Sequence, residues 1–273
     1  MKLYDMHTHT AFSHDSVCPM EEMTKAQLAK GVSGFAATEH CDCLTFSRCD
    51  NGNALLASCL AAEQLDKEYG GAIRIFRGIE IGEGFLAPEN MRHALSLYDY
   101  DIVIGSVHYV HNPNGYSGYC ADTDFSVFSH EELMQFLDAY LNNFMLMLKN
   151  TPCDVMAHLT YALRYINGKY GRNMDLCVFS DKIDDILRYI IDHGIALEVN
   201  TSGIDTAYGD FFPDERILRR YQDFGGTLLT LGSDAHTAER AAVGFRRACA
   251  LLKQIGFTQY YYFEKRRAIS CDL

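Results

Sequence analysis

The stretch Lys2-Leu-Tyr-Asp-Met-His-Thr-His9 decides the fold, because it joins a strand-like pattern to a pair of histidines at the end of that strand. The same design recurs along the chain. A short run rich in aliphatic or β-branched residues is each time followed by a stretch with helical periodicity. We expect seven such strands, over residues 2–9, 34–40, 73–81, 101–109, 153–159, 195–201 and 227–234.

Helical patterns separate these strands. Ser129-x-x-Glu132 is a capping box that opens a helix, and residues 181–193 carry aliphatic side chains at helical spacing before Gly194. A weaker helical pattern follows Pro19. Alternating strands and helices imply a parallel sheet, either a barrel or a doubly wound open sheet, and the patterns do not separate these two. Residues 257–269 predict a further short strand that closes or flanks the sheet.

Length and composition narrow the class of protein. The chain has 273 residues, and an α/β barrel often uses about 250 residues as one domain, so we expect a single domain. The formal net charge of −12 disfavours binding to long nucleic acids. The sequence holds neither a signal-peptide pattern at its N-terminus nor a membrane-length apolar run, which predicts a cytoplasmic protein without membrane contact. Ten scattered cysteines predict reduced thiols.

Histidines and acidic residues gather at the ends of the predicted strands. The carboxyl ends of parallel strands lie on the same side of a barrel or sheet, so we expect these side chains to meet. His7 and His9 are two residues apart on a strand and therefore point to one face. Imidazole and carboxylate together suit Zn, Fe or Mn. A set of hydrogen-bonded structural histidines is the alternative, and the cost of burying so many ionisable groups without a cation disfavours it.

Six motifs resemble, in their expected order, those of the polymerase and histidinol phosphatase (PHP) family. They are Asp5-Met-His7-Thr-His9, Thr38-Glu39-His40, Gly78-Ile-Glu80, Ser106-Val-His108, Ala157-His158 and Gly232-Ser-Asp234-Ala-His236. The segment Leu197-Glu-Val-Asn200-Thr-Ser202-Gly203 and the C-terminal residues 260–267 are most similar to the histidinol-phosphatase branch. The resemblance implies that residues 1–273 form one PHP metallophosphoesterase domain, a distorted TIM-like (β/α)7 barrel with a trinuclear metal centre.

The resemblance also implies a ligand set for three divalent ions, which we expect to be Zn, Fe or Mn. His7, His9, Glu80 and Asp234 would hold the first ion, Glu80 would bridge to a second held by His108 and His158, and His14, His40 and His236 would hold the third. Asp15 is the alternative to His14, because both lie in one loop. Glu39 stands where the family commonly has Asp, and it would either fix the His40 ring or face solvent.

The chemistry that the resemblance implies is hydrolysis of a phosphomonoester. A metal-bound hydroxide would attack phosphorus, so no side chain need act as nucleophile. The histidinol-phosphatase branch implies L-histidinol phosphate as substrate and a role in histidine biosynthesis. We expect Arg164 to bind the phosphate, and Lys169, Arg172 and Arg240 are its alternatives. Asn200 and Ser202 are expected to contact the substrate.

Two other functions stay open at this point. The same metal site would also serve a PHP phosphoesterase acting on a nucleotide or an oligonucleotide end, since a net charge of −12 argues against long polyanions but not short ones. A regulatory metal-binding module without catalysis is disfavoured, because every ligand position is filled. His111, three residues after His108, is expected to line the pocket or to be structural.

Overall fold

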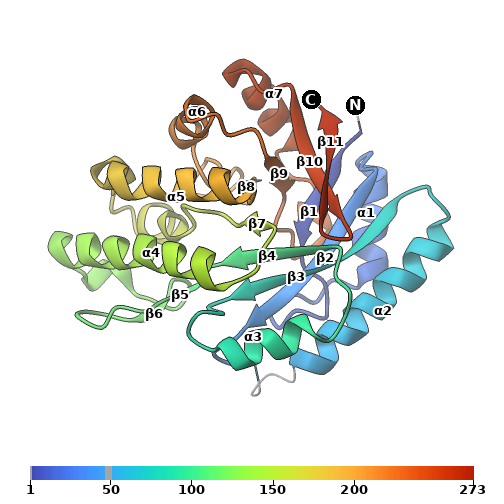
Figure 1. Ribbon diagram of the computed structural model, residues 1–273, viewed down its shortest axis with the longest axis horizontal. Coiled ribbons are helices and arrows are strands. Elements are labelled where there is room, and N and C mark those ends of the chain that lie inside the picture. Colours follow the sequence, from blue (N-terminus) through green and yellow to red (C-terminus); the bar gives the residue numbers. More distant parts are fainter. Residues whose placement is uncertain (1, 47–50) are drawn as a thin grey trace.

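The computed structural model describes residues 2–46 and 51–273 and centres on a seven-stranded parallel sheet (Figure 1). Neighbouring strands follow one another along the chain, in the order β1-β2-β3-β4-β7-β8-β9. Their bounds are β1 (Tyr4–Thr8), β2 (Gly34–Asp42), β3 (Arg74–Gly82), β4 (Ile102–Ser106), β7 (Val155–Met156), β8 (Ala196–Asn200) and β9 (Leu229–Gly232). All seven coincide with predicted strands, although β7 keeps only two residues of its predicted run.

The sheet curls until its last strand returns to its first. The backbone N–H of Asp234 donates to the His7 carbonyl at 2.8 Å, and that of His9 donates to the Ala235 carbonyl at 2.9 Å. Thr8 and Ala235 form an isolated parallel bridge. These contacts make a nearly closed barrel and confirm the expected TIM-like (β/α)7 fold. The alternative of an open, doubly wound sheet is therefore wrong.

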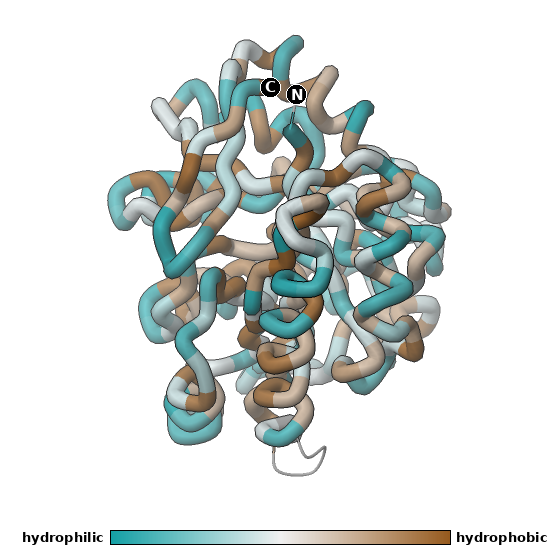
Figure 2. The backbone as a smooth tube through the Cα atoms, turned by 90° about the vertical axis from the view of Figure 1, so that its right-hand side faces the viewer, coloured by the Kyte–Doolittle hydropathy of each residue, from teal (hydrophilic) through white to brown (hydrophobic). Residues whose placement is uncertain are grey.

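Helices cover the outside of the barrel (Figure 1). They are α1 (Met20–Ala29), α2 (Asn51–Tyr69), α3 (Pro88–Leu95), α4 (His130–Asn150), α5 (Ser180–His193), α6 (Glu215–Asp223) and α7 (Phe245–Ile255). The predicted capping box opens α4, where Ser129 Oγ accepts from the Glu132 N–H at 3.2 Å and Glu132 Oε2 accepts from the Ser129 N–H at 2.7 Å. Gly194, with φ of 65°, ends α5 as predicted. Figure 2 shows polar and apolar residues alternating along the covering helices.

Short elements complete the connections between the barrel strands. The hairpin β5 (Tyr109–Val110) with β6 (Gly118–Tyr119) lies between β4 and α4. Single-turn segments η1 (Phe125–Val127), η2 (Arg164–Lys169), η3 (Leu176–Phe179) and η4 (Ala238–Arg240) lie in the loops. Because η2 and η4 follow the carboxyl ends of β7 and β9, they contribute to the face where active sites of such barrels form.

The C-terminal segment differs from the single strand that we expected. It forms an antiparallel hairpin of β10 (Gln259–Glu264) and β11 (Arg267–Asp272), which turns at Lys265 and Arg266 with φ of 52° and 61°. The turn escapes detection in the sequence because such tight hairpins usually carry Asn or Gly at these positions. Tyr260 Oη donates to the Lys2 carbonyl at 2.8 Å and accepts from the Tyr4 N–H at 3.1 Å. The hairpin therefore packs against the start of β1, at the amino ends of the strands.

The cysteines and the helices give two further observations. Nine described cysteines are free thiols, whereas Cys49 lies outside the described residues. Cys41 and Cys43 are buried in the apolar core with their Sγ atoms 3.9 Å apart. Among the described helices, none has the length and apolar character needed to cross a membrane.

Candidate metal centre

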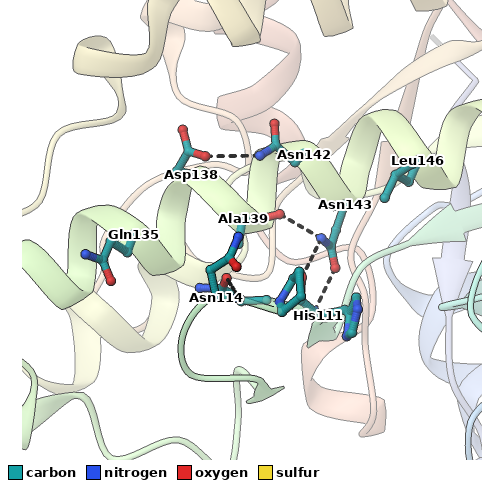
Figure 3. Close-up of a pocket in the computed structure, with 10 residues that line it drawn as sticks. His111, Asn114, Gln135, Asp138, Ala139, Asn142, Asn143 and Leu146 are labelled. Atoms are coloured by element: carbon teal, nitrogen blue, oxygen red, sulfur yellow. Dashed lines mark hydrogen bonds between the residues drawn. The ribbon is translucent and has the colours of Figure 1, made fainter.

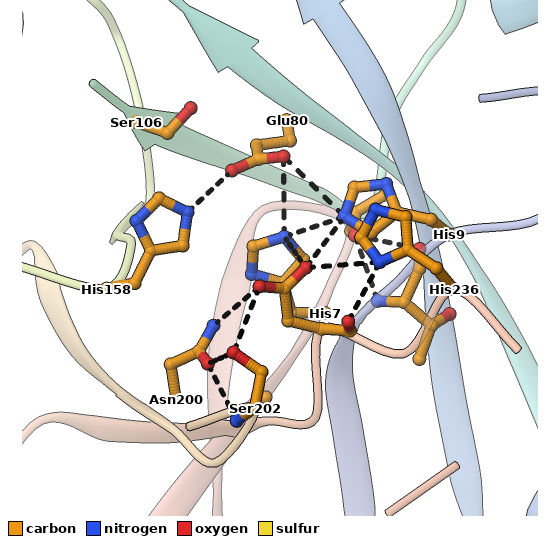
Figure 4. Close-up of polar contacts among 12 residues, drawn as sticks. His7, His9, Glu80, Ser106, His158, Asn200, Ser202 and His236 are labelled. Atoms are coloured by element: carbon orange, nitrogen blue, oxygen red, sulfur yellow. Dashed lines mark hydrogen bonds and ion pairs between the residues drawn. The ribbon is translucent and has the colours of Figure 1, made fainter. Parts of the chain in front are cut away.

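The side chains predicted at the strand ends meet at the carboxyl end of the barrel (Figure 4). They come from strands that are far apart in the sequence. β1 supplies His7, β2 His40 and β3 Glu80, while His9, His108, His158, Asp234 and His236 follow the ends of β1, β4, β7 and β9. The parallel arrangement explains this convergence, because every barrel strand ends on the same side.

Glu80 occupies the middle of the cluster. Its Oε1 atom lies 3.0 Å from His158 Nε2 and 3.2 Å from His108 Nε2. Its Oε2 atom lies 2.8 Å from His40 Nδ1 and 3.5 Å from His7 Nε2. A single fully buried carboxylate thus joins two groups of imidazoles, which is the arrangement expected of a bridging ligand.

The ring nitrogens converge in pairs, as ligands of a shared cation do. The Nε2 atoms of His7 and His9 are 3.1 Å apart, while those of His108 and His158, and of His40 and His236, are 3.4 Å apart. Glu80 Oε2 is buried and has no hydrogen-bond partner among the described residues, although imidazole nitrogens surround it. Four sets of three donors lie within 4.8 Å: His7/His9/Asp234, His7/Glu80/His158, His40/Glu80/His108 and His9/His40/His236. This donor set fits a centre with several metal ions.

The pKa values of the cluster show how strongly it attracts positive charge. Burial opposes the charge on Glu80 and on Asp234, but the surrounding histidines hold the pKa of both carboxyls well below their usual range. Burial likewise opposes a charge on His7, yet the carboxylates of Glu198, Glu80 and Asp234 raise its pKa well above the usual value. For His9, burial prevails and lowers the pKa. The carboxylates therefore stay ionised and create a field that favours cations.

Two buried carboxylates that we did not expect contact the Nδ1 atoms of two predicted ligands, His7 and His108. Glu198 Oε1 lies 2.6 Å from His7 Nδ1, and Asp42 Oδ1 lies 3.2 Å from His108 Nδ1. Glycines make room for both, since a Cβ on Gly232 would lie 2.1 Å from Glu198 Oε1 and one on Gly82 would lie 2.7 Å from Asp42 Oδ1. Such partners orient metal-binding imidazoles. Strand alternation could have revealed Asp42, which shares a strand face with His40 two residues before it.

Asp5 has a structural role beside the cluster. Its carboxylate accepts from the Ser233 N–H at 2.9 Å, from Ser233 Oγ at 2.6 Å and from Gln27 Nε2 at 2.6 Å. These bonds fix the turn that follows β9, in which Asp234 adopts the left-handed backbone conformation with φ of 51°. Such a conformation costs free energy and persists only where neighbouring groups impose it. Asp5 therefore helps to aim Asp234 at the cluster.

The loop after β1 places both Asp15 and His14 beside the predicted ligands of the third ion. Asp15 Oδ2 lies 3.1 Å from His236 Nε2 and 3.4 Å from His40 Nε2. His14 lies beside the same histidine, with 5.3 Å between the centres of the His14 and His40 rings, and it lines a cavity together with Asp15 and His40. Asp15 therefore makes direct contacts with two predicted ligands of the third ion, and the choice between Asp15 and His14 stays a prediction.

Glu39 takes neither of the two positions that we considered. Its carboxylate is fully buried and does not contact the His40 ring; it accepts from Thr10 Oγ1 and from Ser13 Oγ, both at 2.6 Å. Adjacent residues of a strand point to opposite faces, so Glu39 faces the helix side while His40 faces the cluster.

A cavity of about 330 Å³ opens beside the cluster, and two of the expected or alternative phosphate-binding residues line it. Arg164 lies in η2 with its Nη1 atom 3.3 Å from Ser202 Oγ, and Arg240 in η4 donates from Nη2 to the Ser202 carbonyl at 2.7 Å. Asn200 is fully buried, and its Nδ2 atom lies 3.4 Å from Asp234 Oδ2. Asn200 and Ser202 thus lie between the arginines and the cluster.

Three other candidates lie elsewhere. Arg172 donates to the carbonyls of Phe125 and Phe128, and Lys169 lies over the Tyr170 ring at 5.0 Å. His111 lines a separate cavity of about 540 Å³ along α4 (Figure 3). Its backbone is held there by Asn143, whose Oδ1 atom accepts from the His111 N–H at 2.8 Å. His111 is therefore outside the cavity beside the cluster.

Comparisons with known proteins agree with this site. The model of the PHP domain family matches residues 5–202. Relatives include a probable histidinol-phosphatase of Clostridium acetobutylicum, 27% identical over 97% of this chain and 98% of its own, and a histidinol-phosphatase of Lactococcus lactis, 29% identical over 96% and 95%. A solved histidinol phosphate phosphatase from Lactococcus lactis, complexed with Zn, L-histidinol and phosphate, superposes with a TM-score of 0.79 at 23% identity and covers 98% of this chain and 99% of its own. The expected family is thereby confirmed: this chain belongs to the PHP domain family.

Proposed function

We propose that this protein is a metal-dependent phosphatase that hydrolyses L-histidinol phosphate to L-histidinol and phosphate. One observation carries the proposal: the buried cluster of metal-binding side chains adjoins two cavities of different charge. Arg164 and Arg240 line one of them, which we call the basic wall, and Asp42 and Asp122 line the other, which we call the acidic wall. The substrate assignment rests on two observations. Relatives that match nearly the whole chain are named histidinol-phosphatases, and a similar solved structure contains Zn, L-histidinol and phosphate.

The cluster would hold three divalent ions, which we propose to be Zn, Fe or Mn. His7, His9, Glu80 and Asp234 would bind the first, Glu80, His108 and His158 the second, and His40 and His236 with Asp15 in place of His14 the third. Divalent ions bound there supply a water of lowered pKa and neutralise charge on the phosphoryl oxygens. Glu198 and Asp42 would keep the rings of His7 and His108 in place.

The basic wall suits the phosphate group. Arg164 and Arg240 come from different loops and line the same cavity beside His236. Guanidinium groups bind phosphate oxygens through paired N–H donors. Because Arg164 and Arg240 both lie next to Ser202, they would hold a phosphate between themselves and the cluster. The ester oxygen of that phosphate would then face the neighbouring cavity.

The acidic wall suits the amine of the substrate. A second cavity of about 310 Å³ shares His40 and His108 with the first and is lined further by Asp42, Tyr119 and Asp122. Carboxylates stabilise an alkylammonium and repel a second phosphate. This wall therefore favours a leaving group that carries positive charge, as histidinol does.

The side chains near the phosphate position favour water as the nucleophile. Ser202 Oγ donates to Asn200 Oδ1 at 2.7 Å. An amide oxygen is not a base that could activate a hydroxyl group, so this bond commits the Ser202 proton to a structural role. Asp234 Oδ2 is the other acceptor within reach of Ser202 Oγ, but at 3.3 Å it is the longer contact, so the single hydroxyl hydrogen goes to Asn200.

A panel of phosphate esters tests the proposal. Phosphate release should be measured for histidinol phosphate, for adenosine monophosphate and for p-nitrophenyl phosphate, which lacks an amine, with protein loaded separately with Zn, Mn and Fe. We expect kcat/KM for histidinol phosphate of at least about 10⁴ M⁻¹s⁻¹, and values for the other two esters that are roughly a hundredfold lower. Equal or faster hydrolysis of the nucleotide would favour a PHP phosphoesterase acting on nucleotide ends.

Two features of the protein remain predictions. One is the extension of a single PHP domain over residues 1–273, because the family model matches residues 5–202. The other is a cytoplasmic location.

A further inference from the structure

A chain of buried hydrogen bonds runs from helix α2 to the ring of His9. It links Ser58 of α2, Glu39 of β2 and Ser13 of the loop after β1. The exposed fractions of these three side chains are 2%, 0% and 4%. None of them belongs to the proposed ligand set, and burying a carboxylate at this place requires an explanation.

Glu39 receives four hydrogen bonds, two at each oxygen. Oε1 accepts from Thr10 Oγ1 at 2.6 Å and from Ser58 Oγ at 3.0 Å. Oε2 accepts from Ser13 Oγ at 2.6 Å and from the Thr10 N–H at 2.9 Å. A carboxylate only accepts, so the hydrogens of all four partners point toward Glu39. The single hydroxyl hydrogen of Ser13 is therefore committed to Glu39.

The direction of this hydrogen determines which hydrogen bond Ser13 can form with His9. Ser13 Oγ lies 3.1 Å from His9 Nδ1 and also accepts from the His40 N–H at 3.2 Å. Because its own hydrogen points to Glu39, Ser13 can only accept from the ring, so a hydrogen bond between the two side chains requires the hydrogen to be on Nδ1 of His9. In a neutral imidazole the other nitrogen, Nε2, then keeps its lone pair. That atom faces the cluster, 3.2 Å from Asp234 Oδ1.

We propose that Glu39 and Ser13 are positioning residues, which fix the tautomer of His9 so that Nε2 is ready to bind a metal ion. The proposal rests on the metal centre proposed above. Glu39 acts on His9 through a hydroxyl group, whereas Glu198 contacts His7 directly. This role requires a carboxylate at position 39. The amide nitrogen of a glutamine there would carry two N–H donors toward partners that are themselves donors, so their hydrogen bonds would be lost.

The tautomer can be measured without any metal. Ring-nitrogen NMR spectra of metal-free protein labelled with ¹⁵N-histidine should be recorded at pH 8, where an ordinary imidazole is neutral. The His9→Gln variant assigns the His9 signals. We expect hydrogen on Nδ1 of His9 in the wild type and in the control Ser58→Ala, which removes a hydroxyl from the same carboxylate but not from the path to His9. Ser13→Ala and Glu39→Gln should each shift His9 toward the other tautomer.

Zinc affinity, measured by competition with a chelator, gives a second readout. Ser13→Ala and Glu39→Gln should weaken zinc binding by about 10- to 100-fold, whereas Ser58→Ala should stay within about threefold of the wild type. Hydrogen on Nε2 in the wild type, or an unchanged tautomer in both Ser13→Ala and Glu39→Gln, would overturn the proposal. If the wild type bound no zinc, the proposed metal centre would fail, and the NMR spectra would still decide the role of Glu39 and Ser13.

Discussion

The two ends of the barrel bury different kinds of side chain. At the carboxyl ends of the strands, histidines and carboxylates crowd around Glu80. At the amino ends, the β10–β11 hairpin stacks the Tyr262 ring on Tyr4, with 4.0 Å between ring centres, and ion pairs join Arg77 to Asp101 at 2.7 Å and Arg74 to Glu264 at 2.9 Å. The first arrangement concentrates carboxylates and imidazoles around a position that a cation can occupy, while the second pairs opposite charges with each other. The comparison separates the residues that serve chemistry from those that serve stability.

Glu80→Gln should have the largest effect on activity. The change removes the charge that joins the two groups of imidazoles, and metal centres of this kind contribute several kcal/mol to transition-state stabilisation. We expect kcat/KM for histidinol phosphate to fall by about a thousandfold or more, with an unchanged far-UV circular dichroism spectrum. A variant that kept activity within tenfold of the wild type would show that Glu80 is not central.

Asp101→Asn is the matching change at the opposite end. Asp101 is 1% exposed and also accepts from the N–H groups of Arg77 and Lys265, so its loss should cost about 3 kcal/mol of stability. Urea unfolding at pH 7 checks this value. The kcat of the folded fraction should not change; a large loss would mean that the two ends are coupled.

The pH dependence of the Asp101 contribution follows from its pKa. Burial opposes the charge, but hydrogen bonds from Arg77 hold the pKa of Asp101 below its usual value. A lowered pKa in the folded protein means that the contribution is complete above the unfolded value of about 4 and is lost as the pH falls through the folded value. The difference in unfolding free energy between wild type and Asp101→Asn should therefore shrink below about pH 4.

Asp15→Asn and His14→Ala sharpen the description of the metal end. Both residues are exposed, but Asp15 Oδ2 contacts two of the proposed ligands, while His14 lies beside His40 with 5.3 Å between ring centres. We expect Asp15→Asn to weaken binding of the third ion by about 10- to 100-fold and His14→Ala to change it by less than about threefold. Elemental analysis after dialysis against a weak chelator measures both, and the reverse order would restore His14 as ligand.

Arg164→Ala should give the smallest effect, confined to substrate binding. Loss of one charged partner of the phosphate should raise KM for histidinol phosphate about tenfold, with metal content unchanged. Arg172→Ala is the control, because Arg172 binds backbone carbonyls outside the cavity. It should leave KM unchanged. Equal changes in KM for the two variants would argue against the proposed basic wall.

The sequence predicted the parallel sheet and the cluster because both follow from a local pattern, whereas the closed barrel was expected only from the resemblance to the PHP family. Six of the seven predicted strands end in a ligand-type residue, as in Asp5-x-His7-x-His9, and parallel strands bring their ends together. The choice between His14 and Asp15 depends on the path of the loop backbone. Glu198 was missed because its partner His7 lies 191 residues away, and only the closed sheet brings the two side chains within 2.6 Å.

Removal and return of metal tests the central claim most directly. Protein stripped by a chelator should release phosphate from histidinol phosphate at less than about 1% of the rate of the loaded protein, as expected when several kcal/mol of stabilisation are lost. Stepwise addition of zinc should restore the rate, with saturation at three equivalents. Full activity in the stripped protein, or a rate that zinc, manganese and iron all fail to restore, would contradict the account.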